Sequence, residues 1–330
     1  MGAERSDTNT TSSAAPRLTL PLAGLALLLG VVILLAVLFG ATNLSWSDPS
    51  ARAIIFQLRL PRALLAALVG AILAVAGVTF QTILRNPLAD PFILGVSGGA
   101  ACAAAVVSAL GLAHVPGLIP LVAFAGACGA TAVVFLLARR RDHTDPTRLL
   151  ISGLVLNAFF SAVILLAFAL APQSDLTAAL RWMMGSLFGA AWSDVVVCGV
   201  LLVAALGVLV AYANDMRMLA FGEDDAKSRG VDVERVKLIA LGAASLITGA
   251  AVAVSGIIGF VGLLVPHLIR LIWRRDFRVL LPLCALGGAT LLVAGDLVSR
   301  IILPPVELPL SAFTAILGVP FFLSLLRRAR

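Results

Sequence analysis

Long apolar runs alternate with short polar segments along almost the whole chain. The first run, residues 18–41, has 24 residues, so a helix at about 1.5 Å per residue crosses a hydrocarbon layer of about 30 Å. This run is too long for the core of a signal peptide, and we predict a retained helix. The polar, Ser/Thr-rich residues 1–17 predict a disordered tail, and residues 18–330 predict one transmembrane domain.

Nine further runs predict the remaining spans of an all-α polytopic membrane protein with about ten helices. A transmembrane barrel is excluded because its strands would be short and alternate apolar with polar positions. The eighth span is short and contains Pro266. The nine ranges are 60–82, 95–110, 117–138, 149–170, 192–213, 236–254, 260–273, 279–298 and 308–326.

Basic residues predict the orientation of these spans. If both termini lie inside and the spans alternate, 19 of the 24 Lys and Arg residues fall in cytoplasmic segments. The five outside are Arg52, Arg59, Arg62, Arg181 and Arg300. This asymmetry obeys the positive-inside rule, and moving one boundary by a helix would destroy it. We therefore predict cytoplasmic N- and C-termini.

Composition narrows the class of protein further. Hydrophobic residues make up 61% of the chain and charged residues 12%, about half the usual share of ~25%. These values exclude a soluble enzyme, a disordered protein and a disulfide scaffold. The net charge of +7 comes from clusters between apolar runs, which is typical of membrane orientation and not of nucleic-acid binding. The four cysteines stand alone in apolar runs, without the spacing of a metal site.

A weak internal repeat links two of the predicted helices. Residues 70–78 (GAILAVAGV) resemble residues 249–257 (GAAVAVSGI). The first segment would run inward and the second outward, which is the arrangement of an inverted repeat in transporters. The alternative is coincidence between two helices that are both rich in Ala, Gly and Val.

The chain carries no visible energy source and no catalytic constellation. It has no GxxxxGK[ST] phosphate loop, and neither of its two lysines, Lys227 and Lys237, follows a glycine. No acid or lysine lies at the middle of a span, and no Ser/His/Asp or HExxH set occurs. We predict no catalytic residue, no metal and no cofactor, so the energy must come from another subunit.

The longest predicted cytoplasmic loop, residues 214–234, has the pattern of a docking element. Glu223 and two further acids come first, Lys227 and a second base follow, and Gly230 comes last. Acids early, bases late and glycine just past the end are typical of a short capped helix. Such a helix between two spans can act as a lever for a partner, whereas the alternative is a solvated connector.

Several long motifs, in order, resemble the FecCD-like permease subunits of type II ABC importers for iron–siderophore, haem and cobalamin uptake. The resemblance covers nearly everything after residue 50. Departures from the family pattern are Phe221 and Arg229, where leucine is usual, and Gly295, where alanine is common. The motifs lie at residues 58–62, 69–77, 80–81, 85–91, 94–100, 181–186, 222–231, 255–270, 276, 280–282, 294–296 with 300, 307–309 and 314–320.

The resemblance implies a multi-pass protein in the cytoplasmic membrane of a prokaryote. A second permease subunit, identical or paralogous, two ATP-binding cassette ATPase subunits and an extracytoplasmic substrate-binding protein are the implied partners. The implied function is uptake of a ferric siderophore by alternating access, with haem or cobalamin as alternatives. A stand-alone secondary transporter would need ionisable groups at mid-span, and a membrane enzyme would need a clustered polar site; the sequence offers neither.

The resemblance also implies an outer docking site for the binding protein at Arg59, Arg62 and Arg300. Arg59 and Arg62 flank Pro61 at the expected outer start of the second span, and a spacing of three places both on one helix face. Arginine suits this role because its planar fork pairs with carboxylates. The alternative is snorkelling toward lipid phosphates.

Two further sets of residues carry expected roles at the cytoplasmic side. The resemblance implies a cytoplasmic gate at Asn86–Leu88; Pro87 and Pro91 prevent a continued helix there, and the alternative is an ordinary tight turn. Pro266 frees a backbone carbonyl that His267 can bond, in a structural pair or as part of the gate. The gate candidates are Asn86, Pro87, Leu88, Thr147, Pro266 and His267, and the coupling-loop candidates are Leu219, Phe221, Gly222, Glu223, Ala226 and Gly230.

Overall fold

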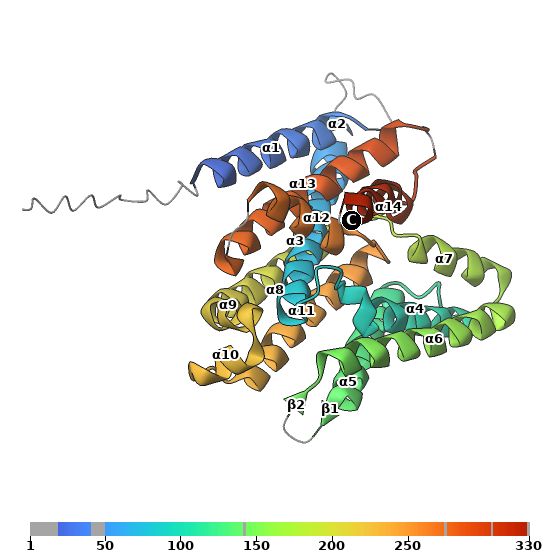
Figure 1. The fold of residues 1–330 in the computed structure, drawn as a ribbon. Helices are drawn as coiled ribbons and strands as arrows, with labels where there is room; N and C mark the ends of the chain where they lie inside the picture. The colour runs from blue at the N-terminus through green and yellow to red at the C-terminus, as the bar shows by residue number, and fades with distance from the viewer. Residues whose placement is uncertain (1–18, 41–49, 141–142, 274–275, 305, 329–330) are drawn as a thin grey trace, which may run out of the picture.

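The computed structural model describes residues 19–40, 50–140, 143–273, 276–304 and 306–328, and it is nearly all helical (Figure 1). The predicted disordered tail, residues 1–17, lies outside the described residues. The elements are α1 Thr19–Leu38, α2 Ser50–Ala53, the π-helix η1 Ile54–Arg59, α3 Leu60–Ile83, the 3₁₀-helix η2 Pro91–Leu94, α4 Val96–Ala109, α5 Leu118–Ala138, β1 Arg139–Arg140, β2 His143–Thr144, α6 Pro146–Leu170, α7 Gln173–Met183, α8 Trp192–Ala211, α9 Ala213–Phe221, α10 Glu223–Ser228, α11 Val233–Ser255, α12 Val261–Ile272, α13 Phe277–Ile301 and α14 Leu310–Arg328.

The predicted all-α polytopic class is confirmed. Within the described residues, seven helical segments are long and apolar enough to cross a membrane: α1, the continuous helix Ala51–Ile83, α5, α6, α8, α11 and α13. Three shorter apolar helices, α4, α12 and α14, coincide with the third, eighth and tenth predicted spans. The number of crossings and the side of the termini stay predictions. The sequence patterns missed α7 and α9, which are too polar for spans.

Helix α3 begins at Leu60 with Pro61 in its first turn, as predicted, but the helical backbone before it was not expected. This backbone starts at Ser50, and the π-helix η1, Ile54–Arg59, comes immediately before α3. The N–H of Leu60 donates to the carbonyl of Ile55, five residues back, instead of the usual four. This wider turn accommodates a proline, whose ring would clash with the preceding turn of an α-helix.

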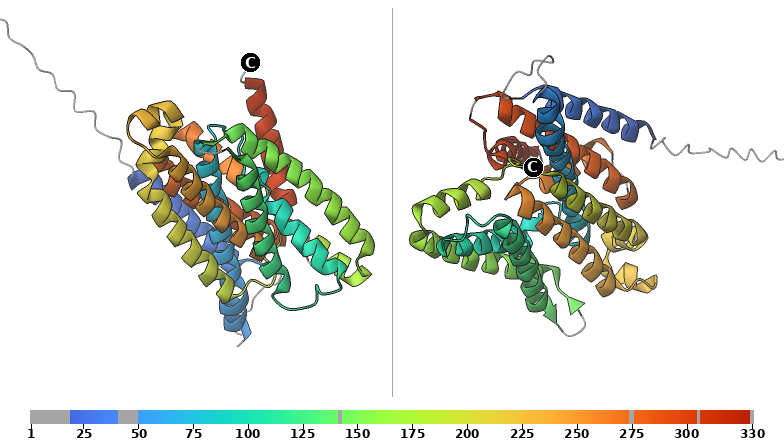
Figure 2. Two further views of the ribbon diagram at one scale, coloured as in Figure 1. Left: turned by 90° about the horizontal axis from the view of Figure 1, so that it is seen from below. Right: turned by 180° about the vertical axis from the view of Figure 1, so that it is seen from behind.

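Helix α3 lies at the centre of the molecule, packed against α11, α12 and α13 (Figures 1 and 2). It is the most buried of the candidate spans. Two glycines permit this close packing: a Cβ at Gly70 would lie 2.2 Å from the carbonyl oxygen of Gly288, and one at Gly77 only 1.9 Å from that of Gly262. Small residues let membrane helices approach backbone to backbone.

The glycines at matching positions of the proposed repeat have different structural environments. Gly249 lies inside α11, where an added Cβ would be 3.1 Å from the Cβ of Ala127, a much looser contact than at Gly70. Gly256 ends α11 with a φ of +69°, whereas Gly77 lies inside a helix. The inverted repeat therefore stays a prediction, although its two segments lie on neighbouring buried helices.

Replacing Gly77 by alanine is expected to destabilise the fold. The new methyl group would meet backbone, which cannot rotate away, so α3 and α12 must separate at a cost of about 1–3 kcal/mol or more. Thermal unfolding of the purified protein in detergent measures this loss. The matched control is Gly207→Ala on α8, where nothing lies within 4 Å of the added atom, and an equal loss in both variants would contradict the close-packing argument.

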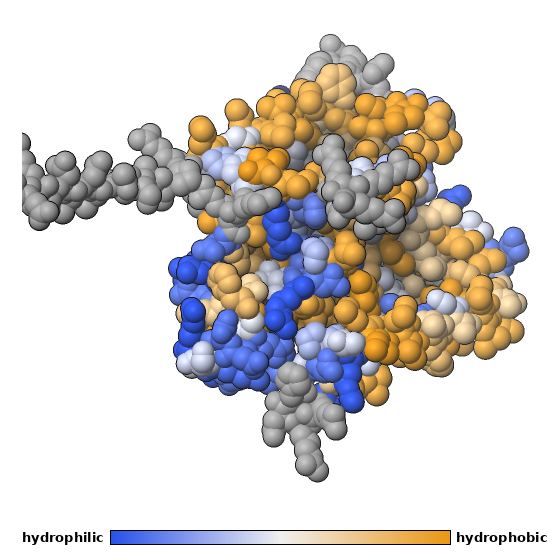
Figure 3. Space-filling view, in the orientation of Figure 1, coloured by the Kyte–Doolittle hydropathy of each residue, from blue (hydrophilic) through white to orange (hydrophobic). Residues whose placement is uncertain are grey.

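Apolar side chains cover much of the visible face, while hydrophilic residues gather over α9 and α10 (Figure 3). The windows of α1 and α6 are the least buried of the candidate spans, and α6 exposes large side chains such as Leu154, Leu165 and Leu166. Apolar faces of this size contact lipid or another subunit. The polar cap over α9 and α10 lies where the coupling loop was predicted.

Candidate functional site

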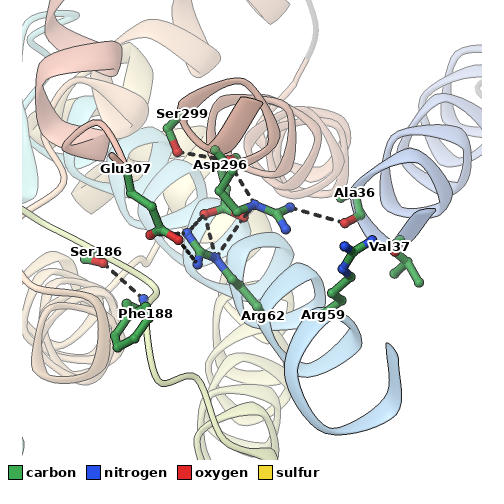
Figure 4. A network of polar contacts seen from close by, with 10 residues as sticks. Ala36, Val37, Arg59, Arg62, Ser186, Phe188, Asp296, Ser299 and Glu307 are labelled. Carbon is green, nitrogen blue, oxygen red and sulfur yellow. Dashed lines mark hydrogen bonds and ion pairs between the residues drawn. The ribbon is translucent and has the colours of Figure 1, made fainter. Parts of the chain in front are cut away.

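Arg62 is the centre of an ion network at the end of the molecule where α3 begins (Figure 4). Its Nη2 donates to Oδ1 of Asp296 on α13 at 2.8 Å, and its Nη1 donates to Oε1 of Glu307 at 2.8 Å. The Asp296 side chain is 1% exposed, whereas that of Glu307 is 31% exposed. Two carboxylates therefore already occupy both sides of the guanidinium fork.

The other two arginines of the predicted docking site bind the end of α1. Arg59 donates from Nη1 to the carbonyl of Leu38 at 2.8 Å, and Arg300 donates from Nη2 to that of Ala36 at 3.2 Å. Arg300 also pairs through Nε with Oδ2 of Asp296 at 3.1 Å. These carbonyls belong to the last turn of α1, the negative end of its dipole, where cations are favoured.

The structure gives all three predicted docking arginines partners within the chain. Arg59 reaches α1 and Arg62 reaches α13. Arg59 and Arg300 are also buried, and all three guanidinium groups have acceptors within the chain. Docking through these residues stays a prediction. Sequence reasoning missed Asp296 and Glu307 as partners, although the spacing of four between Asp296 and Arg300 is the signal of a helix ion pair.

The coupling-loop segment folds into two short helices that meet at Gly222. Helix α10 confirms the predicted capped helix, whereas α9 was not expected. Gly222 has a φ of 151°, a region that L residues rarely adopt, and Gly230 closes the segment with a φ of 83°. Leu219 on α9 and Ala226 on α10 are fully buried and anchor the pair, while Phe221 is 73% exposed at the joint.

Lys237 holds this pair of helices in place, and sequence reasoning assigned it no role. Its side chain is 1% exposed, and Nζ lies 2.8 Å from Oε1 of Glu223 on α10. It also donates to the carbonyl of Thr144 at 3.0 Å and to Oε1 of Glu234 at 3.3 Å. One ammonium group thus joins α10, α11 and the β-hairpin. Glu223 was expected to meet a basic residue of a partner, but it has one within the chain.

The proline-rich segment after α3 forms a turn stabilised by its own side chains. Oδ1 of Asn86 accepts the N–H of Leu88 at 2.9 Å, and the carbonyl of Asn86 accepts that of Ala89 at 3.0 Å. Pro87 and Leu88 are exposed. Asp90 then caps η2 by accepting the N–H of Phe92 at 2.8 Å. Burial raises the pKa of Asp90 to about 6, although this hydrogen bond lowers it.

Thr147 and the coupling joint line one cavity of about 1050 Å³ at this end of the molecule. Thr147 donates its backbone N–H to Asp145, which caps α6. Arg85, Gly222 and Glu223 form other parts of the wall. The structure therefore brings one gate candidate next to the coupling residues, on the face where hydrophilic side chains gather (Figure 3). The gate role itself stays a prediction.

The expected bond between His267 and the carbonyl freed by Pro266 is not the one formed. Pro266 releases the carbonyl four residues back, that of Gly262, and this oxygen accepts Nε2 of Gln81 at 3.1 Å. Gln81 in turn accepts a hydrogen bond from Arg270. The His267 ring instead packs edge-on against Phe321 and Phe322 of α14, with ring centroids 5.8 Å apart in both cases.

No group of three or more His, Cys, Asp or Glu residues that could hold a metal occurs within the described ranges. The polar sites at the two ends of the molecule are networks of ion pairs and hydrogen bonds. They join helices that are far apart in the sequence.

Comparisons with known proteins identify the family. Residues 27–328 match the FecCD transport family. The chain is 44% identical over 279 residues to the cobalamin import permease BtuC of Halobacterium salinarum, covering 84% of this chain and 74% of that protein. It is 38% identical over 323 residues to the hemin permease HmuU of Yersinia pestis, covering 92% and 96%.

A solved structure agrees with these relatives. It is described as an inward-facing conformation of a putative metal-chelate type ABC transporter. It superposes with a TM-score of 0.84 at 32% sequence identity and covers 93% of this chain and 98% of its own. The chain therefore belongs to the FecCD transport family and is a permease of an ABC importer.

Proposed function

We propose that this permease carries a large metal chelate, specifically a ferric siderophore, across the cytoplasmic membrane of a prokaryote by alternating access. The main support is the match along nearly the whole chain to a transporter described as of metal-chelate type. The low charge of the spans suits a path that must not hold a bulky cargo tightly. Selection of the chelate would then fall to a separate binding protein.

Cobalamin is the second candidate cargo. The Halobacterium relative and the vitamin B12 permease of Escherichia coli O9:H4 (strain HS), which is 37% identical over 313 residues, are both named for cobalamin import. The Yersinia relative is named for hemin. All three cargoes are large metal chelates, so the proposed transport class does not depend on which of them is carried.

The proposed energy source is a pair of ATPase subunits that dock against α9 and α10. The absence of a phosphate loop from the sequence supports this division of labour. The exposed Phe221 and the acids of α10 offer a contact surface, and the buried Lys237 would transmit motion from α10 to α11. Thr147 and the Asn86–Leu88 turn would form the cytoplasmic gate next to this surface.

The proposed partner at the opposite end is an extracytoplasmic binding protein. It would dock around the network of Arg59, Arg62 and Arg300, where the half-exposed Glu307 offers a carboxylate that a partner could displace. A second permease subunit, identical or paralogous, would complete the path. The exposed apolar face of α6 is compatible with such an interface.

Reconstitution tests the proposed function. The permease would be placed in liposomes with its ATPase and binding protein, and ATP-dependent uptake of a radiolabelled ferric siderophore, cyanocobalamin and hemin would be compared. We expect uptake of the siderophore and no uptake or ATP hydrolysis by the permease alone. Uptake of cyanocobalamin only would select the second candidate, while ATP-independent uptake would overturn the division of labour.

Replacing Gly222 by valine is expected to uncouple ATP hydrolysis from uptake. A β-branched residue at a φ of 151° carries strain of about 1–3 kcal/mol. A change of the backbone at residue 222 would relieve this strain and move α10 relative to α9. The number of molecules imported per ATP hydrolysed should fall, while the permease still folds. Gly207→Val on α8 is the matched control, because open space surrounds that glycine; normal coupling in Gly222→Val would contradict the role of the joint.

A further inference from the structure

A groove of about 730 Å³ runs between α5 and α11 beside the β-hairpin, and Thr144 and Glu234 of the Lys237 network also line it. Its deep walls are mostly apolar and include Phe135 and Leu136 of α5 and Leu238 of α11. Leu136 and Leu238 line the groove and are 73% and 58% exposed. Gly242 keeps the groove open, because nothing lies within 4 Å of the position where its Cβ would be.

The groove has the depth of one membrane leaflet. Its walls extend from Cys128 to Arg139 along α5 and from Arg235 to Leu246 along α11. Each stretch corresponds to about 16 Å at the rise of an α-helix, which is half of a hydrocarbon core of about 30 Å. Both arginines lie at the same end, which is the end of the coupling loop, because Lys237 on α11 pairs with Glu223 on α10.

Two arginines and two acids lie at the mouth of the groove, and both acids are engaged within the chain. Asp232 accepts the N–H of Arg235 at 3.1 Å, and Glu234 accepts that of Thr144 at 2.8 Å and lies 3.3 Å from the ammonium group of Lys237. The side chains of Arg139 and Arg235 are exposed, and neither is ion-paired in the part of the chain that the structure describes. Two guanidinium forks above an apolar groove match a phosphate attached to a hydrocarbon chain.

We propose that this groove binds a glycerophospholipid of the cytoplasmic leaflet. Its phosphate lies between Arg139 and Arg235, and one acyl chain follows the groove between α5 and α11. Basic pockets between membrane helices on the cytoplasmic side are a known way to hold lipid head groups. The lipid proposal rests on the proposed function in one respect: the proposed function places the end of the molecule that carries α9 and α10 in the cytoplasm.

Lipid binding to the purified full chain in detergent tests the proposal directly. Native mass spectrometry would follow titration with phosphatidylglycerol and with dioleoylglycerol, which has the same chains but no phosphate. We expect phosphatidylglycerol to bind and dioleoylglycerol to bind at least tenfold more weakly. Equal binding of the two lipids would overturn the phosphate site.

Two pairs of variants separate the head-group contact from the acyl-chain contact. Arg139→Gln with Arg235→Gln should weaken phosphatidylglycerol binding on the order of thirtyfold, about fivefold per arginine, whereas Arg148→Gln with Arg229→Gln should leave it unchanged. Gly242→Leu fills the groove and should weaken both lipids, whereas Gly207→Leu should weaken neither. Unchanged binding in the first double variant or in Gly242→Leu overturns the proposal.

The outcome is independent of the transport assay, because no ATPase, binding protein or chelate takes part. If the wild-type permease binds phosphatidylglycerol as expected but imports no chelate in the reconstituted system, only the proposed function is contradicted. If the permease imports the chelate but the double variant Arg139→Gln with Arg235→Gln binds phosphatidylglycerol as the wild type does, only the lipid site is contradicted.

Discussion

Replacing Asp296 by alanine is expected to destabilise the protein by about 3–5 kcal/mol, among the largest effects of any single substitution in this chain. The carboxylate is fully buried, accepts hydrogen bonds from Arg62 and is ion-paired with Arg300. Its removal leaves two guanidinium groups inside the protein with one remaining carboxylate, Glu307. Thermal and denaturant unfolding of the purified permease in detergent would measure the loss.

A double-mutant cycle separates the ion pair from simple loss of packing. Asp296→Leu combined with Arg62→Leu should recover part of the stability lost in Asp296→Leu, because the uncompensated charge disappears with it. Arg52→Leu, an exposed residue of the same end, serves as the control and should change stability little. A purely additive cycle, or a loss below about 0.5 kcal/mol in Asp296→Ala, would contradict the structural role of the network.

The same variants test the docking prediction. If Arg62 acts mainly within the chain, Arg62→Leu should lower the unfolding temperature of the isolated permease. If it acts mainly through a partner, the unfolding temperature should stay constant and only association with the binding protein should slow, most clearly at low salt. Two bonds of 2.8 Å to carboxylates of its own chain favour the first outcome.

Replacing Lys237 by methionine is expected to cause the second large effect, about 2–4 kcal/mol of lost stability together with impaired coupling. Methionine keeps the apolar stem but leaves Glu223 and Glu234 as neighbouring carboxylates without the ammonium between them. The hairpin residue Thr144 also loses the donor to its carbonyl. We expect a lower unfolding temperature and fewer molecules imported per ATP hydrolysed.

Lys227 provides the matched control, because it is the other lysine of the chain and is exposed on α10. Lys227→Met should leave the unfolding temperature unchanged. Lys237→Arg offers a second test, since it keeps the charge but cannot fit the same buried site without movement. A wild-type unfolding temperature in Lys237→Met would show that the three elements are held together by other contacts.

The sequence determined where the long apolar helices lie and that the chain belongs in a membrane, although it missed the polar helices α7 and α9. In a hydrocarbon layer the backbone must satisfy its own hydrogen bonds, so a long apolar run has little choice but to form a helix. Helix α10 was also readable, since acids, bases and glycine mark its ends locally. The π-helix before Pro61 could not be predicted, because a proline disrupts the regular α-helical hydrogen bonds without specifying which backbone geometry replaces them.

Tertiary structure alone decided which side chain each polar group meets. The arginines near Pro61 looked like surface residues, yet Arg62 finds Asp296, 234 positions away, when α3 packs on α13. The carbonyl freed by Pro266 is taken by Gln81 of α3 and not by the adjacent His267. No local pattern marks Lys237, yet α10, α11 and the β-hairpin converge on it. Hydropathy is a local property that can be read from the sequence. The partner of a buried charge lies on another helix, and only the fold brings the two helices together.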